Sequence, residues 1–314
     1  MKLQQLRYFL EVYRCNLNIS EAAEILFTSQ PGISKQIKLL EDELGVQLFV
    51  RHGKRIVAVT PPGQAVLEIA ERIFRDVQSI RNIGTEFAEQ DSGHLTIATT
   101  YTQARHVLPP VVAEFFRQYP KVGLSLVPAD PSAVDRMVAE GLADFAINSE
   151  ADARHSELRH ISARAWNRCV LVPQGHALAG KSRISLADLS SMPLIGYTNA
   201  EQDTALQQAF AGSGLTLPQV VLASMDAGVI KTYVRAGLGV GLLADAAYDP
   251  QRDADLVCLP ADHLFKPSFT YIVVRQDAYL RNYAYDFMQL YLPGLTRDRI
   301  EQALYEPIRE DFSI

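Results

Sequence analysis

Polar and basic side chains gather between residues 29 and 38 in a pattern that suits the edges of DNA bases. Glutamine can form two hydrogen bonds with adenine, serine can bond to any base, and lysine reaches guanine or phosphate. The group comprises Ser29, Gln30, Pro31, Ser34, Lys35, Gln36 and Lys38. Ordinary solvated side chains on a small helical domain would explain these residue types about as well.

A second basic group follows further along the chain. Arg51, Lys54 and Arg55 surround a glycine, between segments that alternate as strands over residues 47–50 and 55–59. This pattern predicts a hairpin with a basic tip. Such a tip suits the phosphate backbone or the minor groove beside the bases that the first group would contact.

A neutral polar group occupies residues 100–103, where a predicted strand gives way to a helix. It comprises Thr100, Tyr101, Thr102 and Gln103. Free backbone N–H groups at such a turn bind anions, and threonine hydroxyls and glutamine amides add neutral donors. No lysine or arginine is needed for such a site. Helix capping alone would account for most turns of this composition.

Three short helices must position the first group. Apolar spacing predicts helices over residues 3–15, from the N-cap Ser20 to Leu26, and from about Pro31 to Leu44. Pro31 suits a first helical turn, where its missing N–H costs nothing. Ile33, Ile37, Leu40 and Leu44 are expected to point inward, and Gly45 to end the helix. Residues 1–60 therefore read as a winged helix-turn-helix domain that is mainly α-helical.

A long helix is predicted over residues 61–88. Its apolar residues recur in alternating steps of four and three, at Val66, Ala70, Ile73, Val77, Ile80, Gly84 and Phe87. Heptad spacing of this kind favours pairing with a second copy of the same helix, and hence a homodimer. The alternative is a helix that packs on its own domain.

The spacing of the apolar residues changes after the polar segment 89–93, and we place a domain boundary there. Strands and helices then alternate, which predicts an α/β domain over residues 93–314 with parallel strands. Two such series suggest two lobes, lobe I at about 93–165 plus 267–291 and lobe II at about 166–266. A small molecule would bind between them. The tail from residue 296 to about 304 is expected to be a surface helix.

The charge distribution fits a head that binds nucleic acid. Residues 1–60 carry eight Lys/Arg against six Asp/Glu, which makes this segment +2 in a chain of net charge −6. Neither a secretory signal nor a transmembrane segment is apparent, so no membrane association is expected. The three cysteines, Cys15, Cys169 and Cys258, lie far apart in the sequence. They fit buried, inert thiols in a reducing cytoplasm.

Enzyme signatures are missing from the sequence. The seven histidines show no metal-ligand spacing, and Gly237-Leu238-Gly239-Val240-Gly241-Leu242 lacks the third glycine of a dinucleotide fingerprint. Gly212-Ser213-Gly214 is not a nucleophile elbow. We therefore expect no catalysis, no metal and no cofactor. A transported-solute receptor is also disfavoured, because it would need an export signal and would not carry residues 1–88.

The N-terminal residues resemble those of LysR-type transcriptional regulators. The resemblance rests on Phe9, Ala22-Ala23, Ser29-Gln30-Pro31-Gly32-Ile33-Ser34, Leu40-Glu41, Leu44-Gly45, Leu48-Phe49, Thr60-Pro61 and Gly63. It implies a winged helix-turn-helix, a dimerising linker helix and a C-terminal domain with a periplasmic-binding-protein-like fold. It further implies tetramers that bend double-stranded promoter DNA and contact RNA polymerase.

A narrower resemblance rests on residues 28–36, 40–45, 97–100, 102–105, 143–147, 229–235, 237–241 and 295–298. These segments resemble the CysB/Cbl subfamily, whose effector is an acetylserine and whose cleft holds sulfate-type anions. The subfamily's effector contacts map onto Thr100, Thr102, Gln103 and Trp166, and Ser149 stands where the subfamily has threonine. The loop 197–204 departs from the pattern, and Thr198, Gln202 and Thr204 are candidates for its missing donor. Glu201 and Asp203 in the same loop would repel an anion.

The resemblance implies a cytoplasmic activator of sulfate-assimilation and cysteine-biosynthesis genes. Its effector would be O-acetylserine, N-acetylserine or sulfate, and it would act as a homodimer or homotetramer. The alternative within the family is a regulator of another pathway with a different small anionic or polar effector.

Overall fold

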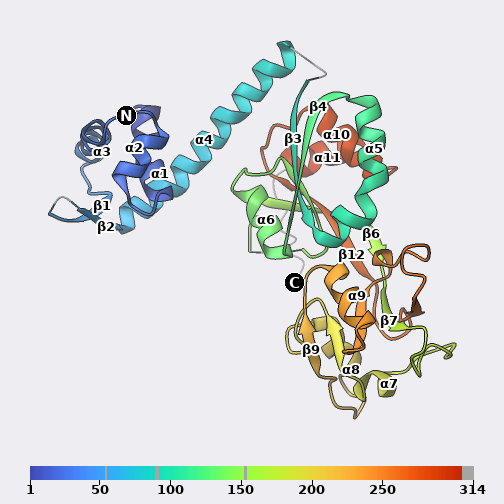
Figure 1. Ribbon diagram of the computed structural model, residues 1–314. Helices are drawn as coiled ribbons and strands as arrows, with labels where there is room; N and C mark the ends of the chain where they lie inside the picture. Colours follow the sequence, from blue (N-terminus) through green and yellow to red (C-terminus); the bar gives the residue numbers. More distant parts are fainter. Residues whose placement is uncertain (54, 89–91, 152–153, 306–314) are drawn as a thin grey trace, which may run out of the picture. The chain divides into compact units, whose positions relative to one another are not determined.

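The computed structural model describes residues 1–53, 55–88, 92–151 and 154–305. The chain divides into two compact units, Met1–Thr85 and Glu86–Ile314, whose elements are labelled in Figure 1. Lys54, one of the expected DNA contacts, lies outside the described residues. No helix within these described ranges is both long enough and apolar enough to cross a membrane.

The first unit is a three-helix domain with a two-stranded wing, as the sequence predicts. Its elements are α1 (Leu3–Arg14), α2 (Ile19–Ile25), α3 (Gln30–Leu44), β1 (Phe49–His52) and β2 (Arg55–Val59). The two strands pair antiparallel. The expected N-cap of α2 is wrong: the side chain of Asn18, not Ser20, accepts the backbone N–H groups of Ser20 and Glu21. Asparagine two residues earlier reaches both free amides, so the helix starts sooner.

The buried face of α3 matches the predicted stripe except at its end. Ile33, Ile37 and Leu40 are fully buried, whereas Leu44 is exposed. Leu44 was expected to point inward, but it is the last helical residue before Gly45 turns into the left-handed region with φ 70°. Glu41 takes up the space beneath the wing and is only 3% exposed. Its carboxylate accepts hydrogen bonds from the backbone N–H groups of Leu48 (2.9 Å) and Phe49 (3.2 Å).

The predicted long helix is present as α4 (Pro61–Ala88). Only part of its apolar stripe is open for the predicted pairing with a second copy. Ala70 is fully buried, and Val66 and Ile73 pack against the core of the three-helix domain. These three side chains are therefore covered by their own unit. Heptad spacing alone does not tell whether an apolar stripe packs on a second helix or on its own domain. Ile80 is 67% exposed, so an apolar residue of the stripe remains open in the second half. The side chain of Phe87 lies outside the described part of the helix.

The second unit begins with a mixed five-stranded sheet, which forms lobe I. Its strand order is β4 (Lys121–Ala129), β3 (Ser92–Thr100), β5 (Phe145–Asn148), β12 (Ser268–Arg275) and β6 (Leu158–Trp166). β3 is parallel to β4 and β5, while β12 is antiparallel to β5 and β6. The parallel pattern predicted for the first three strands is confirmed by β3, β4 and β5. The sequence analysis missed β6, whose arginines and histidine break a clear alternation.

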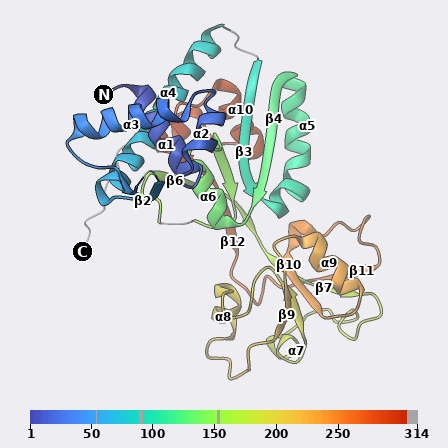
Figure 2. The same cartoon turned by 60° about the vertical axis from the view of Figure 1, so that its left-hand side comes forward.

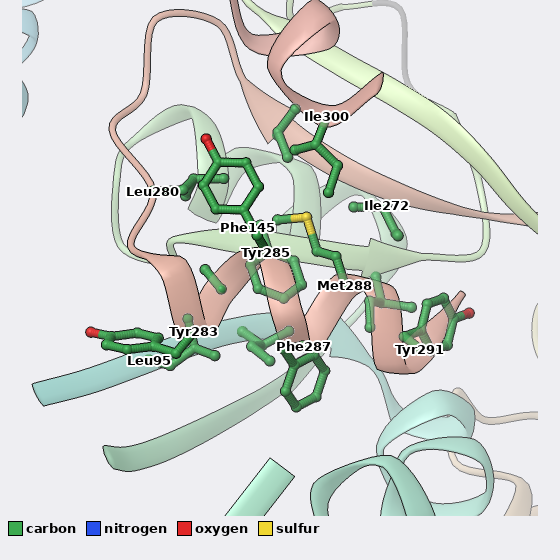
Figure 3. Packing of buried hydrophobic residues seen from close by; sticks show 14 of the residues in the cluster. Leu95, Phe145, Ile272, Leu280, Tyr283, Tyr285, Phe287, Met288, Tyr291 and Ile300 are labelled. Carbon is green, nitrogen blue, oxygen red and sulfur yellow. The ribbon is translucent and has the colours of Figure 1, made fainter. Parts of the chain in front are cut away.

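Helices cover both faces of this sheet. α5 (Leu108–Gln118), α10 (Asn282–Tyr291) and α11 (Arg297–Tyr305) share one core with it, and α6 (Pro131–Ala139) packs on the opposite face. Figure 3 shows the first of these cores, where Phe287 of α10 packs on Phe145 of β5 with ring centroids 5.9 Å apart. The expected surface helix at the C-terminal end, α11, instead buries Ile300 and Leu304 completely. Its polar composition hid this narrow apolar stripe.

Lobe II is a second five-stranded sheet, ordered β11 (Leu256–Pro260), β7 (Arg168–Pro173), β10 (Val240–Ala244), β8 (Leu194–Gly196) and β9 (Val220–Ala223). β8, β9 and β10 are parallel, and β7 is antiparallel to β10 and β11. α7 (Leu186–Ser190) and α8 (Thr204–Phe210) cover one face, and α9 (Ala227–Arg235) the other (Figure 2). The sequence missed β11. The glycine-rich segment 237–241 packs closely on a helix, since a Cβ at Gly241 would lie 2.9 Å from Val234 of α9.

We predict that Glu41→Ala destabilises the three-helix domain by about 2–4 kcal/mol, because two buried N–H groups lose their acceptor. Hydrogen exchange of peptides that cover α3 and the hairpin measures the change. Glu41→Gln keeps one side-chain oxygen and should lose about half as much. Unchanged protection in Glu41→Ala would show that the wing is anchored elsewhere.

Candidate ligand cleft and nucleic-acid interface

A cleft of about 770 Å³ opens between the two sheets of the second unit. Residues from both lobes line it. They include every side chain that the sequence proposed for a ligand: Thr100, Tyr101, Thr102, Gln103, Ser149, Trp166, Thr198, Gln202 and Thr204. Its volume suits a small molecule. These residues come from four separate stretches of the chain, so the fold brings together what the sequence keeps apart.

The lobe I wall forms where parallel strands end. Thr100 is the last residue of β3, and the backbone becomes helical at Tyr101. Ser149 follows the end of the neighbouring strand β5. Thr100 and Gln103 are buried, so their polar groups face the cleft or protein rather than bulk water. The neutral side chains of residues 100–103 and Ser149 share this wall with the acidic side chains Asp130 and Glu150, which the sequence analysis did not name.

The lobe II wall carries a charged pair that the sequence analysis did not foresee. The guanidinium of Arg168 donates to both carboxylate oxygens of Asp203, at 2.8 and 3.0 Å. Asp203 also caps α8 by accepting the N–H of Leu206 (3.0 Å). We expected Asp203 to repel an anion, but its charge is balanced in this way. Glu201, the other acid of the loop, is exposed and is not among the cleft-lining residues.

Two contacts join the lobes beside the cleft. The hydroxyls of Thr102 in lobe I and Tyr197 in lobe II lie 3.2 Å apart. On the adjoining surface, Arg105 donates to Asp226 at 2.9 Å. Burial raises the pKa of Tyr197, so its hydroxyl keeps its proton. Tyr197 was not predicted from the sequence. An isolated tyrosine after a three-residue strand gives no signal beyond that of a core residue.

The surface of α3 presents most of the predicted base-reading group. Gln30, Pro31, Lys35 and Lys38 are exposed, while Ser34 and Gln36 are half-buried. Ser29 is the N-cap and accepts the N–H of Gly32 at 3.3 Å, which leaves its hydroxyl hydrogen for a partner. The side chains therefore line one face of the helix and its start.

The wing offers fewer free cations than the sequence suggested. Arg55 is exposed, but Arg51 lies 3.5 Å from the buried carboxylate of Glu41. Arg51 is thus held at the base of the wing. The sequence analysis did not single out Phe27, which lies on the surface of the same domain. It precedes α3, has φ 49° and is 97% exposed.

The cysteines are closer together than their spacing implied. Cys169 and Cys258 lie in the adjacent strands β7 and β11, and a hydrogen bond between them raises the pKa of Cys169 and lowers that of Cys258. In the described part of the chain, no three His, Cys, Asp or Glu side chains cluster as a metal site requires.

Comparison with known proteins identifies both units. Residues 3–64 match the bacterial regulatory helix-turn-helix protein family of the lysR type, and residues 88–295 match the LysR substrate binding domain. The transcriptional regulator CysB of Burkholderia cenocepacia is 46% identical over 305 residues, which cover 97% of each chain. The regulator SsuR of the same organism is 44% identical over 312 residues, covering 98% of this chain and 100% of that protein.

A solved structure supports the fold of the second unit. The cofactor-binding domain of the Cbl transcriptional regulator superposes with a TM-score of 0.64 and is 34% identical, covering 69% of this chain and 95% of that domain. The winged helix-turn-helix, the long helix and the two-sheet domain with its cleft occur here in the order that these matches require. The chain belongs to the LysR family of DNA-binding transcriptional regulators.

Proposed function

We propose that this regulator activates genes of sulfate assimilation and cysteine biosynthesis when an acetylserine or a sulfate-type anion binds in its cleft. The relatives named CysB and Cbl belong to regulators of sulfur metabolism. The observation that carries the proposal is the lobe I wall, where Thr100, Thr102, Gln103 and Ser149 converge on one space. Hydroxyl and amide donors of this kind bind a small anion without a matching cation.

The mechanism follows from a ligand that touches both lobes. Thr102 and Gln103 lie on one side of the cleft, and Thr198 and Gln202 on the other. A ligand that contacts both sides binds one lobe arrangement better than another, and it shifts the population by that difference in affinity. In a DNA-bound homodimer or homotetramer, this shift would reposition the helix-turn-helix domains on the promoter and favour contact with RNA polymerase.

A different effector within the same family is the second candidate. The loop 197–204 favours it, since it closes on itself through the Thr198 hydroxyl, which donates to Gln202 at 2.9 Å. The Arg168–Asp203 pair in the same wall also gives this side of the cleft both signs of charge. O-acetylserine itself carries an ammonium and a carboxylate, so another ligand with both charges would suit such a wall equally well.

Binding to a cysteine-biosynthesis promoter fragment tests the proposed function. The fragment is titrated with the protein alone and with O-acetylserine, N-acetylserine or sulfate. We expect at least one of these ligands to change the apparent affinity fivefold or more, a typical allosteric factor of about 1 kcal/mol. Specific binding without any response would support a different effector. No specific binding to the fragment would overturn the sulfur assignment.

We predict that Arg55→Ala weakens DNA binding and flattens the dependence of log affinity on log salt by about 0.9, the share of one phosphate contact. Filter binding at several salt concentrations gives the slope. Arg252→Ala is the matched control, because Arg252 is an exposed arginine of the second unit. Equal slopes for the wild type and Arg55→Ala would remove Arg55 from the interface.

We predict that Gln103→Glu lowers sulfate affinity at least about tenfold, because it replaces a donor with a carboxylate that repels the anion at short range. Trp166 is the single tryptophan of the chain and lines the cleft, so its fluorescence reports binding directly. Gln251→Glu, an exposed position outside the cleft, controls for the added charge. Undiminished sulfate affinity in Gln103→Glu would place the anion elsewhere.

A further inference from the structure

Two tyrosine hydroxyls stand behind the donors of the lobe I wall. We propose that Tyr197 and Tyr291 are positioning residues, which orient Thr102 and Gln103 so that both present hydrogens to the cleft. This orientation makes the cleft selective for anions. The inference rests on the proposed function, in that it assumes an anionic effector at this site.

The amide of Gln103 is fixed from behind. The hydroxyl of Tyr291 donates to its Oε1 at 3.3 Å, and the hydroxyl of Thr270 lies 2.9 Å from that of Tyr291. Tyr291 and Thr270 are at most 1% exposed, so water does not compete for these bonds. Figure 3 shows Tyr291 in the row of aromatic residues that α10 packs into the lobe I core. With Oε1 taken, the amide NH2 of Gln103 is the group left for the cleft.

The hydroxyl of Thr102 is oriented from the other lobe. The backbone N–H of Ala244 donates to the Tyr197 hydroxyl oxygen at 3.2 Å. The Tyr197 and Thr102 hydroxyl oxygens lie 3.2 Å apart, and in the proposed arrangement Tyr197, which already accepts one hydrogen, donates its own to Thr102. Thr102 then accepts from Tyr197 and keeps its hydrogen for a ligand. The chain of donors thus runs from the end of β10 through Tyr197 and Thr102 into the cleft.

The orientation of these donors matters because the one cation among the described cleft-lining residues, Arg168, is paired, and the acidic side chains Asp130 and Glu150 also line the cleft. Arg168 donates two of its N–H groups to Asp203. An amide or a hydroxyl can present either a donor or an acceptor to a ligand. A reversed Gln103 amide would present oxygen and disfavour an anion. Without the tyrosine hydroxyl, the side chain of Thr102 or Gln103 that it orients can rotate. The affinity for an anion should then fall about 3-fold to 10-fold, as for the loss of one hydrogen bond.

Sulfate titrations of the full chain, followed by Trp166 fluorescence, test the inference. Tyr197→Phe and Tyr291→Phe should each weaken sulfate binding about 3-fold to 10-fold. Tyr283→Phe removes another buried hydroxyl from α10, one that donates to the His94 carbonyl at 3.0 Å, and Tyr248→Phe does the same in lobe II outside the cleft. These controls should keep the wild-type affinity even where they lower the melting temperature.

A double-mutant cycle separates positioning from a loss of stability. In a Gln103→Met background, Tyr291→Phe should have no further effect on sulfate affinity, because there is no amide left to orient. Additive losses in this cycle, or an unchanged affinity in Tyr197→Phe and Tyr291→Phe, would overturn the positioning role while leaving sulfate binding intact. A wild-type protein that binds no anion would overturn the inference together with the effector proposed above.

Discussion

The direction of the strands determines where this regulator can bind a ligand. In each sheet, neighbouring parallel strands end at the same edge, and the turns that follow them face the other lobe. Thr100 ends β3, Ser149 follows β5, Tyr197 follows β8 and Ala244 ends β10, and all of them line the cleft. The carboxyl ends of parallel strands are the usual place for ligands in α/β sheets. The antiparallel strands β6 and β7 then carry the chain between the lobes.

This arrangement yields a cleft whose lobe II wall carries a paired charge. The Asp203 carboxylate is held by Arg168 and by the start of α8, so lobe II contributes little net field. The remaining polar groups are hydroxyls and amides, together with the acidic side chains Asp130 and Glu150 of lobe I. Neutral donors of this kind bind an anion through the direction of their hydrogens, and buried partners strengthen that direction. The Thr102–Tyr197 contact spans both lobes, so ligand affinity and lobe arrangement are linked through one hydrogen bond.

The sequence predicted many of the features that local chemistry decides, although it misplaced the N-cap of α2 and the side chain of Leu44. The proline and serine at the start of α3, the glycine at its end and the apolar stripe from Ile33 to Leu40 predict this helix correctly. The polar turns after β3 and β5 likewise pointed to the cleft. Local patterns failed where tertiary contacts decide. The spacing of Ala70 fits a dimer interface and a domain core equally well, and the structure places it in the core. The sequence does not show that Arg168 pairs with Asp203, which lies 35 residues further along the chain.

The central claim is that occupancy of the cleft and binding of promoter DNA are coupled. The most direct test measures the affinities for sulfate, O-acetylserine and N-acetylserine from Trp166 fluorescence, with and without saturating promoter DNA. The account predicts that at least one ligand binds with a different affinity when DNA is present, and that it changes DNA affinity by the same factor, as linkage requires. Ligand affinities that are identical with and without DNA would show that the cleft does not control the helix-turn-helix domains, and would contradict the account.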